Sequence, residues 1–207
     1  MEMPGLIVDP AAFYDLTLRE SKIFNSDLRL PQQVFVQGYM NFKFVEFDLM
    51  LGTKFWPMLV KCMEVFGDSE ISLVVHDPEP QLYFYGKFRR YAAARFFPHS
   101  TSEEYMSPFE WEPDSNIAEA LMYSADVVAW YGSSLKWGFW GERGLEVGVY
   151  ATCDSDAKLP VVEGVPLFDV EEIVEDFLPT LFKNGQVPRD LAEQLKINYR
   201  SVAMDNR

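Results

Sequence analysis

The spacing of apolar residues predicts two helices in the first half of the chain. Asp9 followed by Pro10 is typical of a helix start, and apolar side chains recur at helical spacing from there to about residue 24. A second segment begins after Thr53, keeps its apolar residues on one face and reaches Gly67, a residue suited to end a helix. Both segments are expected to pack one side on a core.

The second half of the chain carries further helical signals. Asp169, with Glu172 three residues later, has the spacing of a capping box. Pro188 is expected to begin a last helix, since proline fits the first turn. A short helix at 103–106 and a longer one at 116–124 are expected within a loop-rich connection.

Alternating apolar and polar residues, and short apolar runs between turn residues, predict the strands. Segments 71–75 and 82–88 flank an Asp-Pro-Glu-Pro turn, so we expect them to form an antiparallel pair. Three later strands with short connections predict an antiparallel meander. The expected strands cover residues 42–49, 71–75, 82–88, 126–131, 135–142 and 144–151.

The order of these elements indicates an α+β fold, because the strands are grouped between helices rather than alternating regularly with them. The length of 207 residues suits a single domain. We therefore expect one α+β domain over 1–207, with a central antiparallel sheet flanked by about five helices. Residues 186–207 are expected either to pack on it or to form a helical extension.

Composition narrows the class of protein. The chain is 48% hydrophobic, which is too apolar for intrinsic disorder, and its net charge of −14 opposes binding to nucleic acids or anionic membranes. No apolar stretch approaches the about 18–20 residues needed to span a bilayer, and the first residues lack the pattern of a secretory signal. Two cysteines and two histidines predict neither a disulfide scaffold nor a metal site. We expect a cytosolic protein without cofactor or metal.

The negative charge is concentrated in the second half of the chain. Residues 101–207 carry 20 of the 32 acidic side chains and only 8 of the 18 basic ones. Three interpretations remain open for this excess: a solvated face that keeps the protein soluble, a docking surface for a basic protein, or metal binding, although the chain has no Asp-x-Asp-x-Asp-Gly loop. The first acidic run comprises Glu103, Glu104, Glu110, Glu112, Asp114, Glu119 and Asp126, and the second comprises Asp169, Glu171, Glu172, Glu175 and Asp176.

Aromatic residues accompany the acidic runs. Trp111 lies between two glutamates, where it either covers the core or anchors a partner. Trp137 and Trp140 fall on opposite faces of an expected strand, so one suits the core and the other a surface groove. Arg143 and Glu146 follow at the next corner, where they either form a structural ion pair or contact a partner.

The sequence around 127–146 resembles small acidic immunity proteins of bacterial polymorphic toxin systems. The resemblance rests on the strand Val127-Val128-Ala129-Trp130, followed by Trp137, Trp140, Arg143 and Glu146. It implies an inhibitor that binds a cognate toxin inside the producing cell. It implies no catalytic residues.

The leading hypothesis is therefore a non-catalytic cytosolic binding protein that neutralises a basic toxin through an acidic, aromatic-rich surface within residues 101–176. One alternative is an enzyme that uses His76 beside Asp77 as a base, with Arg143 and Glu146 nearby. Another is a structural or assembly protein that forms homodimers. The expected partner-binding residues are Glu103, Glu104, Glu110, Trp111, Glu112, Asp114, Trp137, Trp140, Arg143 and Glu146.

Overall fold

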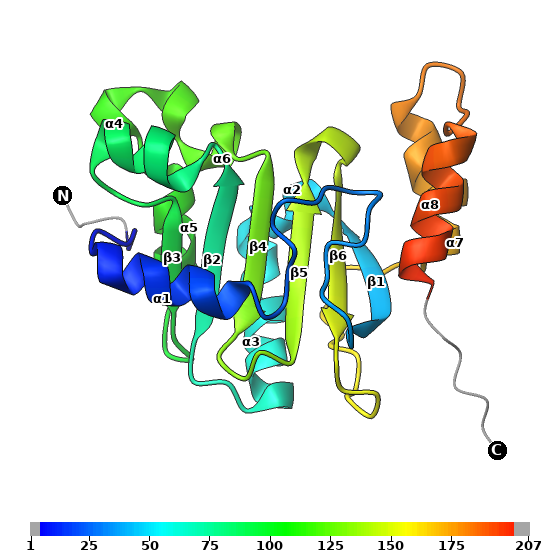
Figure 1. The fold of residues 1–207 in the computed structure, drawn as a ribbon, viewed down its shortest axis with the longest axis horizontal. Coiled ribbons are helices and arrows are strands. Elements are labelled where there is room, and N and C mark those ends of the chain that lie inside the picture. The colour runs from blue at the N-terminus through cyan, green and yellow to red at the C-terminus, as the bar shows by residue number, and fades with distance from the viewer. Residues whose placement is uncertain (1–4, 201–207) are drawn as a thin grey trace.

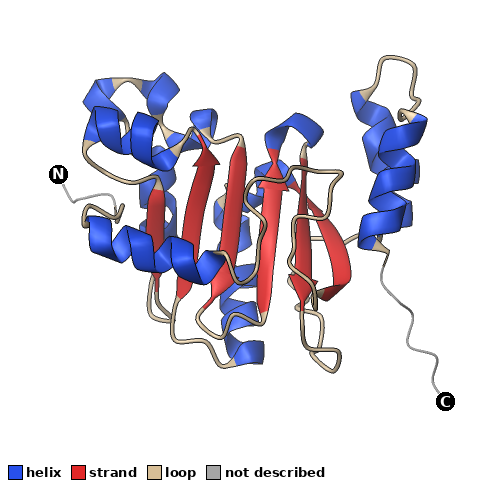
Figure 2. Cartoon of the chain, in the orientation of Figure 1, coloured by secondary structure: helices blue, strands red, loops and turns tan. Residues whose placement is uncertain are grey.

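A six-stranded antiparallel sheet forms the centre of the computed structural model, which describes residues 5–200. Its strand order is β1-β6-β5-β4-β2-β3, and β4, β5 and β6 form the predicted meander (Figure 2). The α+β class is therefore confirmed. The strands are β1 (Met40–Glu46), β2 (Ile71–Asp77), β3 (Ala93–Phe96), β4 (Val127–Gly132), β5 (Trp137–Glu142) and β6 (Val147–Thr152).

Helices cover both faces of this sheet. In Figure 1, α1 crosses the front of the sheet, α3 and α5 lie behind it, and α7 and α8 stand beyond β1. The longer helices are α1 (Pro10–Glu20), α3 (Trp56–Phe66), α5 (Ser102–Glu110) and α8 (Arg189–Tyr199). The shorter ones are α2 (Phe47–Met50), α4 (Gly86–Phe88), α6 (Leu121–Ser124) and α7 (Val170–Glu172).

The sheet carries a hydrophobic core on each face. Trp130 and Phe139 pack with α3 on one face, while Tyr131 and Trp140 pack with α1 on the other. All residues of β4, β5 and β6 are consequently buried. A strand buried on both faces does not need polar residues at alternate positions, which is why this part of the sequence is so rich in aromatic and small residues.

The two predicted helices of the first half are confirmed, with shifted ends. Asp9 accepts a hydrogen bond from the Ala11 amide at 3.1 Å, and α1 ends at Glu20 rather than near residue 24. The residues after Glu20 instead form a loop, in which Phe24 and Phe35 are joined by an isolated antiparallel β-bridge. At the end of α3, Gly67 has a φ of 69°, the left-handed conformation that a helix C-terminus favours.

The predicted strand at 82–88 is wrong, because this segment is helical from Pro80 to Phe88. The carboxylate of Glu79 accepts hydrogen bonds from the amides of Gln81 and Tyr83 and caps the turn. The antiparallel partner of β2 is β3, further along the chain. A local cap therefore outweighs the strand preference of the aromatic residues.

Predictions for the second half are confirmed in part. The short helix at 103–106 extends over α5, whereas the expected helix at 116–124 is interrupted at Ala120, whose ψ is 134°. Asp169 and Glu172 form the predicted capping box, and α8 begins directly after Pro188.

The last helix packs on the sheet rather than extending away from it. The ring of Tyr199 lies edge-on to Phe42 and Phe44, with centroids 5.3 and 5.8 Å apart. The remainder of the expected extension, 201–207, lies outside the described residues. Within 5–200, no helix has the length and hydropathy needed to cross a bilayer.

Candidate functional site

Helix α5 carries the first three residues of the first acidic run, Glu103, Glu104 and Glu110. Its N-terminus carries a full capping box, in which Glu104 Oε2 accepts from the Thr101 amide at 2.8 Å and Thr101 Oγ1 accepts from the Glu104 amide at 3.2 Å. Tyr105 and Phe109 are buried on the inner side, and the Tyr105 hydroxyl donates to the Met50 carbonyl at 2.5 Å. These buried side chains anchor α5 on the core, and the opposite side of the helix faces solvent.

Five exposed carboxylates lie on the outer side of α5 and in the residues that directly follow the helix. None of the five forms an ion pair with any other residue in the described range 5–200. Hydrogen bonds from its own backbone N–H and from Thr101 keep the pKa of Glu103 below its usual range, so this group is ionised at neutral pH. We call these residues the α5 acidic group: Glu103, Glu104, Glu110, Glu112 and Asp114.

The rest of the first run has structural partners. Glu119 accepts hydrogen bonds from Lys87 at 2.5 Å and from the Tyr83 hydroxyl at 3.0 Å, and the lysine lowers its pKa. Asp126 lies 3.3 Å from the Nε of Arg143. These two acids hold neighbouring segments together, which separates them from the α5 acidic group.

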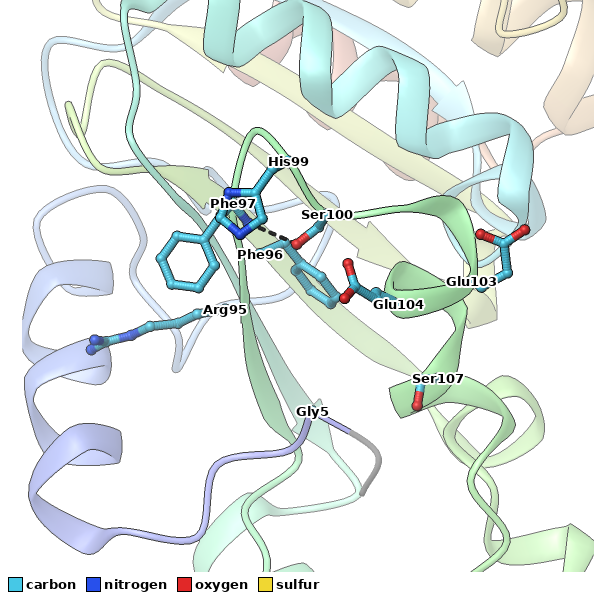
Figure 3. A pocket seen from close by; sticks show the side chains of 9 residues that line it. All are labelled: Gly5, Arg95, Phe96, Phe97, His99, Ser100, Glu103, Glu104 and Ser107. Atoms are coloured by element: carbon cyan, nitrogen blue, oxygen red, sulfur yellow. Dashed lines mark hydrogen bonds between the residues drawn. The ribbon is translucent and has the colours of Figure 1, made fainter. Parts of the chain in front are cut away.

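A cavity of about 510 Å³ opens beside α5, between this helix and the end of β3. Figure 3 shows Phe97 and His99 on one side of it and Glu104 and Ser107 on the other. The rings of Phe97 and His99 are stacked, with centroids 5.7 Å apart and planes only 7° from parallel. The lining consists of Gly5, Arg95, Phe96, Phe97, His99, Ser100, Glu103, Glu104 and Ser107.

The second acidic run lies at the other end of the sheet. It surrounds α7, which stands beyond β1, whereas α5 lies behind β3 (Figure 1). Since neighbouring strands are about 4.8 Å apart, six strands keep the two runs roughly 24 Å from each other. The expectation of one acidic surface over residues 101–176 is therefore wrong: the chain has two separate acidic regions.

Ion pairs and caps occupy most of the second run. Asp169 accepts from Lys43 Nζ at 2.7 Å, Glu171 pairs with Arg200 at 2.8 Å and Glu175 with Lys196 at 2.9 Å. Glu172 Oε2 accepts from the Asp169 amide at 2.7 Å. These pairs link α7, α8 and β1, and they leave little unpaired charge in this run for a partner.

Trp137 and Trp140 do not belong to any surface. Both are 0% exposed, so the expectation that they contact a partner is wrong. The Trp137 indole donates to Asp68 Oδ2 at 2.6 Å, and that of Trp140 donates to Glu142 Oε1 at 2.8 Å. Their polar edges are thus satisfied by two buried carboxylates inside the core.

The other expected binding residues have mixed placements. Trp111 is half-buried, packs near Phe84 and Phe88 and lies under the Arg90 guanidinium, so it covers the core. Arg143 donates to the carbonyls of Ala125 and Met122 and does not pair with Glu146, which is exposed.

The structure does not assemble the alternative catalytic group. His76 Nε2 lies 2.6 Å from Glu20 Oε1, and its ring packs on Trp140, on the α1 face of the sheet. Arg143 lies over the ring of Phe47, which belongs to the core on the other face. His76 therefore contacts Glu20 and Trp140, whereas Arg143 contacts Asp126 and the carbonyls of Ala125 and Met122, and no hydrogen bond or ion pair joins the two within residues 5–200.

Glu20 is a residue that the sequence analysis did not single out. It is 3% exposed, and with His76 and Arg29 it lines a cavity of about 300 Å³. Its position among the apolar residues of α1, at helical spacing from Phe13 and Leu16, was the available signal. Over residues 5–200, no three His, Cys, Asp or Glu side chains are grouped to hold a metal ion.

Compared with protein-family models, with curated proteins and with solved structures, the chain matches none of them.

Proposed function

We propose that this chain is a non-catalytic cytosolic binding protein of the immunity type, which neutralises a basic partner such as a toxin domain through the α5 acidic group. The observation that carries the proposal is the contrast in pairing. Three acids of the second run and two of the first pair with a lysine or an arginine, whereas the five clustered, exposed carboxylates of the α5 acidic group form no ion pair within the described residues.

Electrostatics supports this assignment in two ways. Unpaired surface charges of one sign attract a basic protein over several ångströms and raise its association rate, whereas charges already paired do so much less. The capping box and the buried inner side of α5 hold Glu103, Glu104 and Glu110 on a fixed helix, which lowers the entropy lost when they are bound.

The test starts with co-purification of the protein from its native cells, and then measures association of the purified partner. In the triple variant E103K/E110K/E112K the association rate should fall at least about tenfold at low salt, since rim charges act mainly on the rate of encounter. Glu104 is kept because its carboxylate caps α5.

A matched control carries the same change in formal charge at exposed acids outside the first run: Asp156, Glu163 and Asp176, each replaced by lysine. The association rate of the control variant should fall less than about twofold, because the substituted positions do not face the partner. An equal loss in both variants would mean that net charge alone matters, and an unchanged rate in the triple variant would refute the proposal.

A further inference from the structure

We infer that the cavity between β3 and α5 is a socket for an arginine side chain of the basic partner. This inference rests on the proposed function and specifies the chemistry that the surface recognises. It depends on three features of the cavity beyond its charge: a flat aromatic wall, a carboxylate oxygen without a partner, and a resident arginine that is already neutralised.

The aromatic wall consists of Phe97 and His99. Their planes are 7° from parallel, and Phe97 is 41% exposed, although most phenylalanines of this chain are buried. One face of the Phe97 ring is stacked on His99, and the exposed ring beside the cavity can offer the π electrons of its other face to a ligand. A cation stacked on that face is stabilised, and the planar guanidinium of arginine suits stacking better than an ammonium does.

The opposite wall supplies the acceptor. Glu104 Oε2 accepts from the Thr101 amide, whereas Oε1 has no hydrogen-bond donor within the described part of the chain. Figure 3 shows the Glu104 carboxylate directed toward Ser100 and the cavity, whereas the Glu103 carboxylate points away from the aromatic rings. A guanidinium lying against Phe97 could donate from its edge to Glu104 Oε1, because arginine carries N–H groups around the plane of its guanidinium.

Arg95 lines the cavity but does not neutralise the Glu104 carboxylate. Its guanidinium points toward α1 in Figure 3, and its NH2 donates to Asp15 Oδ2 at 3.0 Å. The ion pair with Asp15 leaves the two glutamates as the uncompensated charges of the lining. The chemistry of the cavity therefore selects a planar cation and disfavours a phosphate or a carboxylate.

The test titrates the full chain with N-acetyl-arginine amide and follows backbone amide signals by NMR. Saturable shifts should be confined to residues 95–107, with a millimolar dissociation constant typical of one side chain. N-acetyl-lysine amide should bind more weakly, and N-acetyl-citrulline amide, which is isosteric and neutral, should not bind. Equal binding of citrulline, or no binding of the arginine probe, would overturn the inference.

Two variants connect the probe to named side chains. Phe97→Leu keeps apolar bulk but removes the π face, and should weaken arginine binding about threefold to fivefold. Glu104→Gln keeps a side chain that can still cap α5, and should weaken it at least as much. Tyr123→Ala, at another exposed ring, is the control and should have no effect. Unchanged affinity in both cavity variants would also overturn the inference.

The two proposals fail in distinguishable ways. If the arginine probe does not bind but E103K/E110K/E112K slows association of the partner, the socket is wrong and the acidic docking surface stands. If the probe binds but the triple variant associates normally, the socket stands as a guanidinium site and the docking surface is wrong.

Discussion

The two acidic segments of this chain, residues 103–114 around α5 and residues 169–176 around α7, have similar compositions and opposite roles in the fold. Around α7, Asp169 pairs with Lys43, Glu171 with Arg200 and Glu175 with Lys196, so acids join a strand and two helices. Around α5, the carboxylates are exposed and have no cation within residues 5–200. Only the exposed, unpaired carboxylates around α5 leave their charge available to another molecule.

This difference shows that a count of charges along a sequence does not locate a binding surface. Ion pairing lowers both the local field and the freedom of the side chain, and pairing depends on which bases the fold brings near. Lys43 lies far from Asp169 in the sequence and reaches it because β1 lies beside α7. The α5 acidic group forms no such pair, because the nearby Arg95 on β3 pairs with Asp15 of α1 and Lys87 pairs with Glu119.

The buried Glu142 should give the largest effect among the acids with structural partners. Its Oε1 accepts from the Trp140 indole and from the Leu30 amide at 2.7 Å, while burial raises its pKa. Glu142→Ala should lower the free energy of unfolding by about 2–4 kcal/mol, because it leaves two buried donors without an acceptor. Urea denaturation followed by circular dichroism measures this change.

Glu142→Gln is the control for that experiment, since the amide oxygen can still accept while the buried charge is removed. It should cost less than the alanine variant. Equal losses in both variants would show that charge, rather than the acceptor, is what the core requires at this position.

A smaller effect is expected at Asp169, which represents the α7 region. Asp169→Ala removes the side chain that caps this helix and pairs with Lys43 Nζ, and should lower the unfolding free energy by about 1–2 kcal/mol. Glu163→Ala, at an exposed acid without such a role, is the comparison. A loss at Asp169 no larger than at Glu163 would remove the distinction between paired and unpaired acids.

The smallest effect on stability is expected in the α5 acidic group. The triple variant E103Q/E110Q/E112Q should change the unfolding free energy by less than about 0.5 kcal/mol, because relief of repulsion offsets the loss of one favourable charge near the helix N-terminus. The same urea titration, done at low and high salt, checks it. A loss above about 1 kcal/mol would mean that these carboxylates support the fold, as the paired acids around α7 do.

Much of the fold could be predicted because its signals are local. Asp9, the Asp169–Glu172 spacing and Gly67 each act on backbone groups within one helical turn, and all three are found at helix ends as expected. The prediction at 82–88 failed because Glu79 caps a helical turn, and aromatic residues fit both a helix and a strand.

The site could be predicted only in part. The sequence by itself determined which residues carry charge, where α1, α7 and α8 begin, and that a meander follows residue 126. Tertiary structure decided which acids are neutralised, that Trp137 and Trp140 lie in the core, and that Phe97 and His99 face α5 across a cavity. The physical reason is that pairing and burial depend on contacts between residues distant in sequence, which only the packed sheet and its helices bring together.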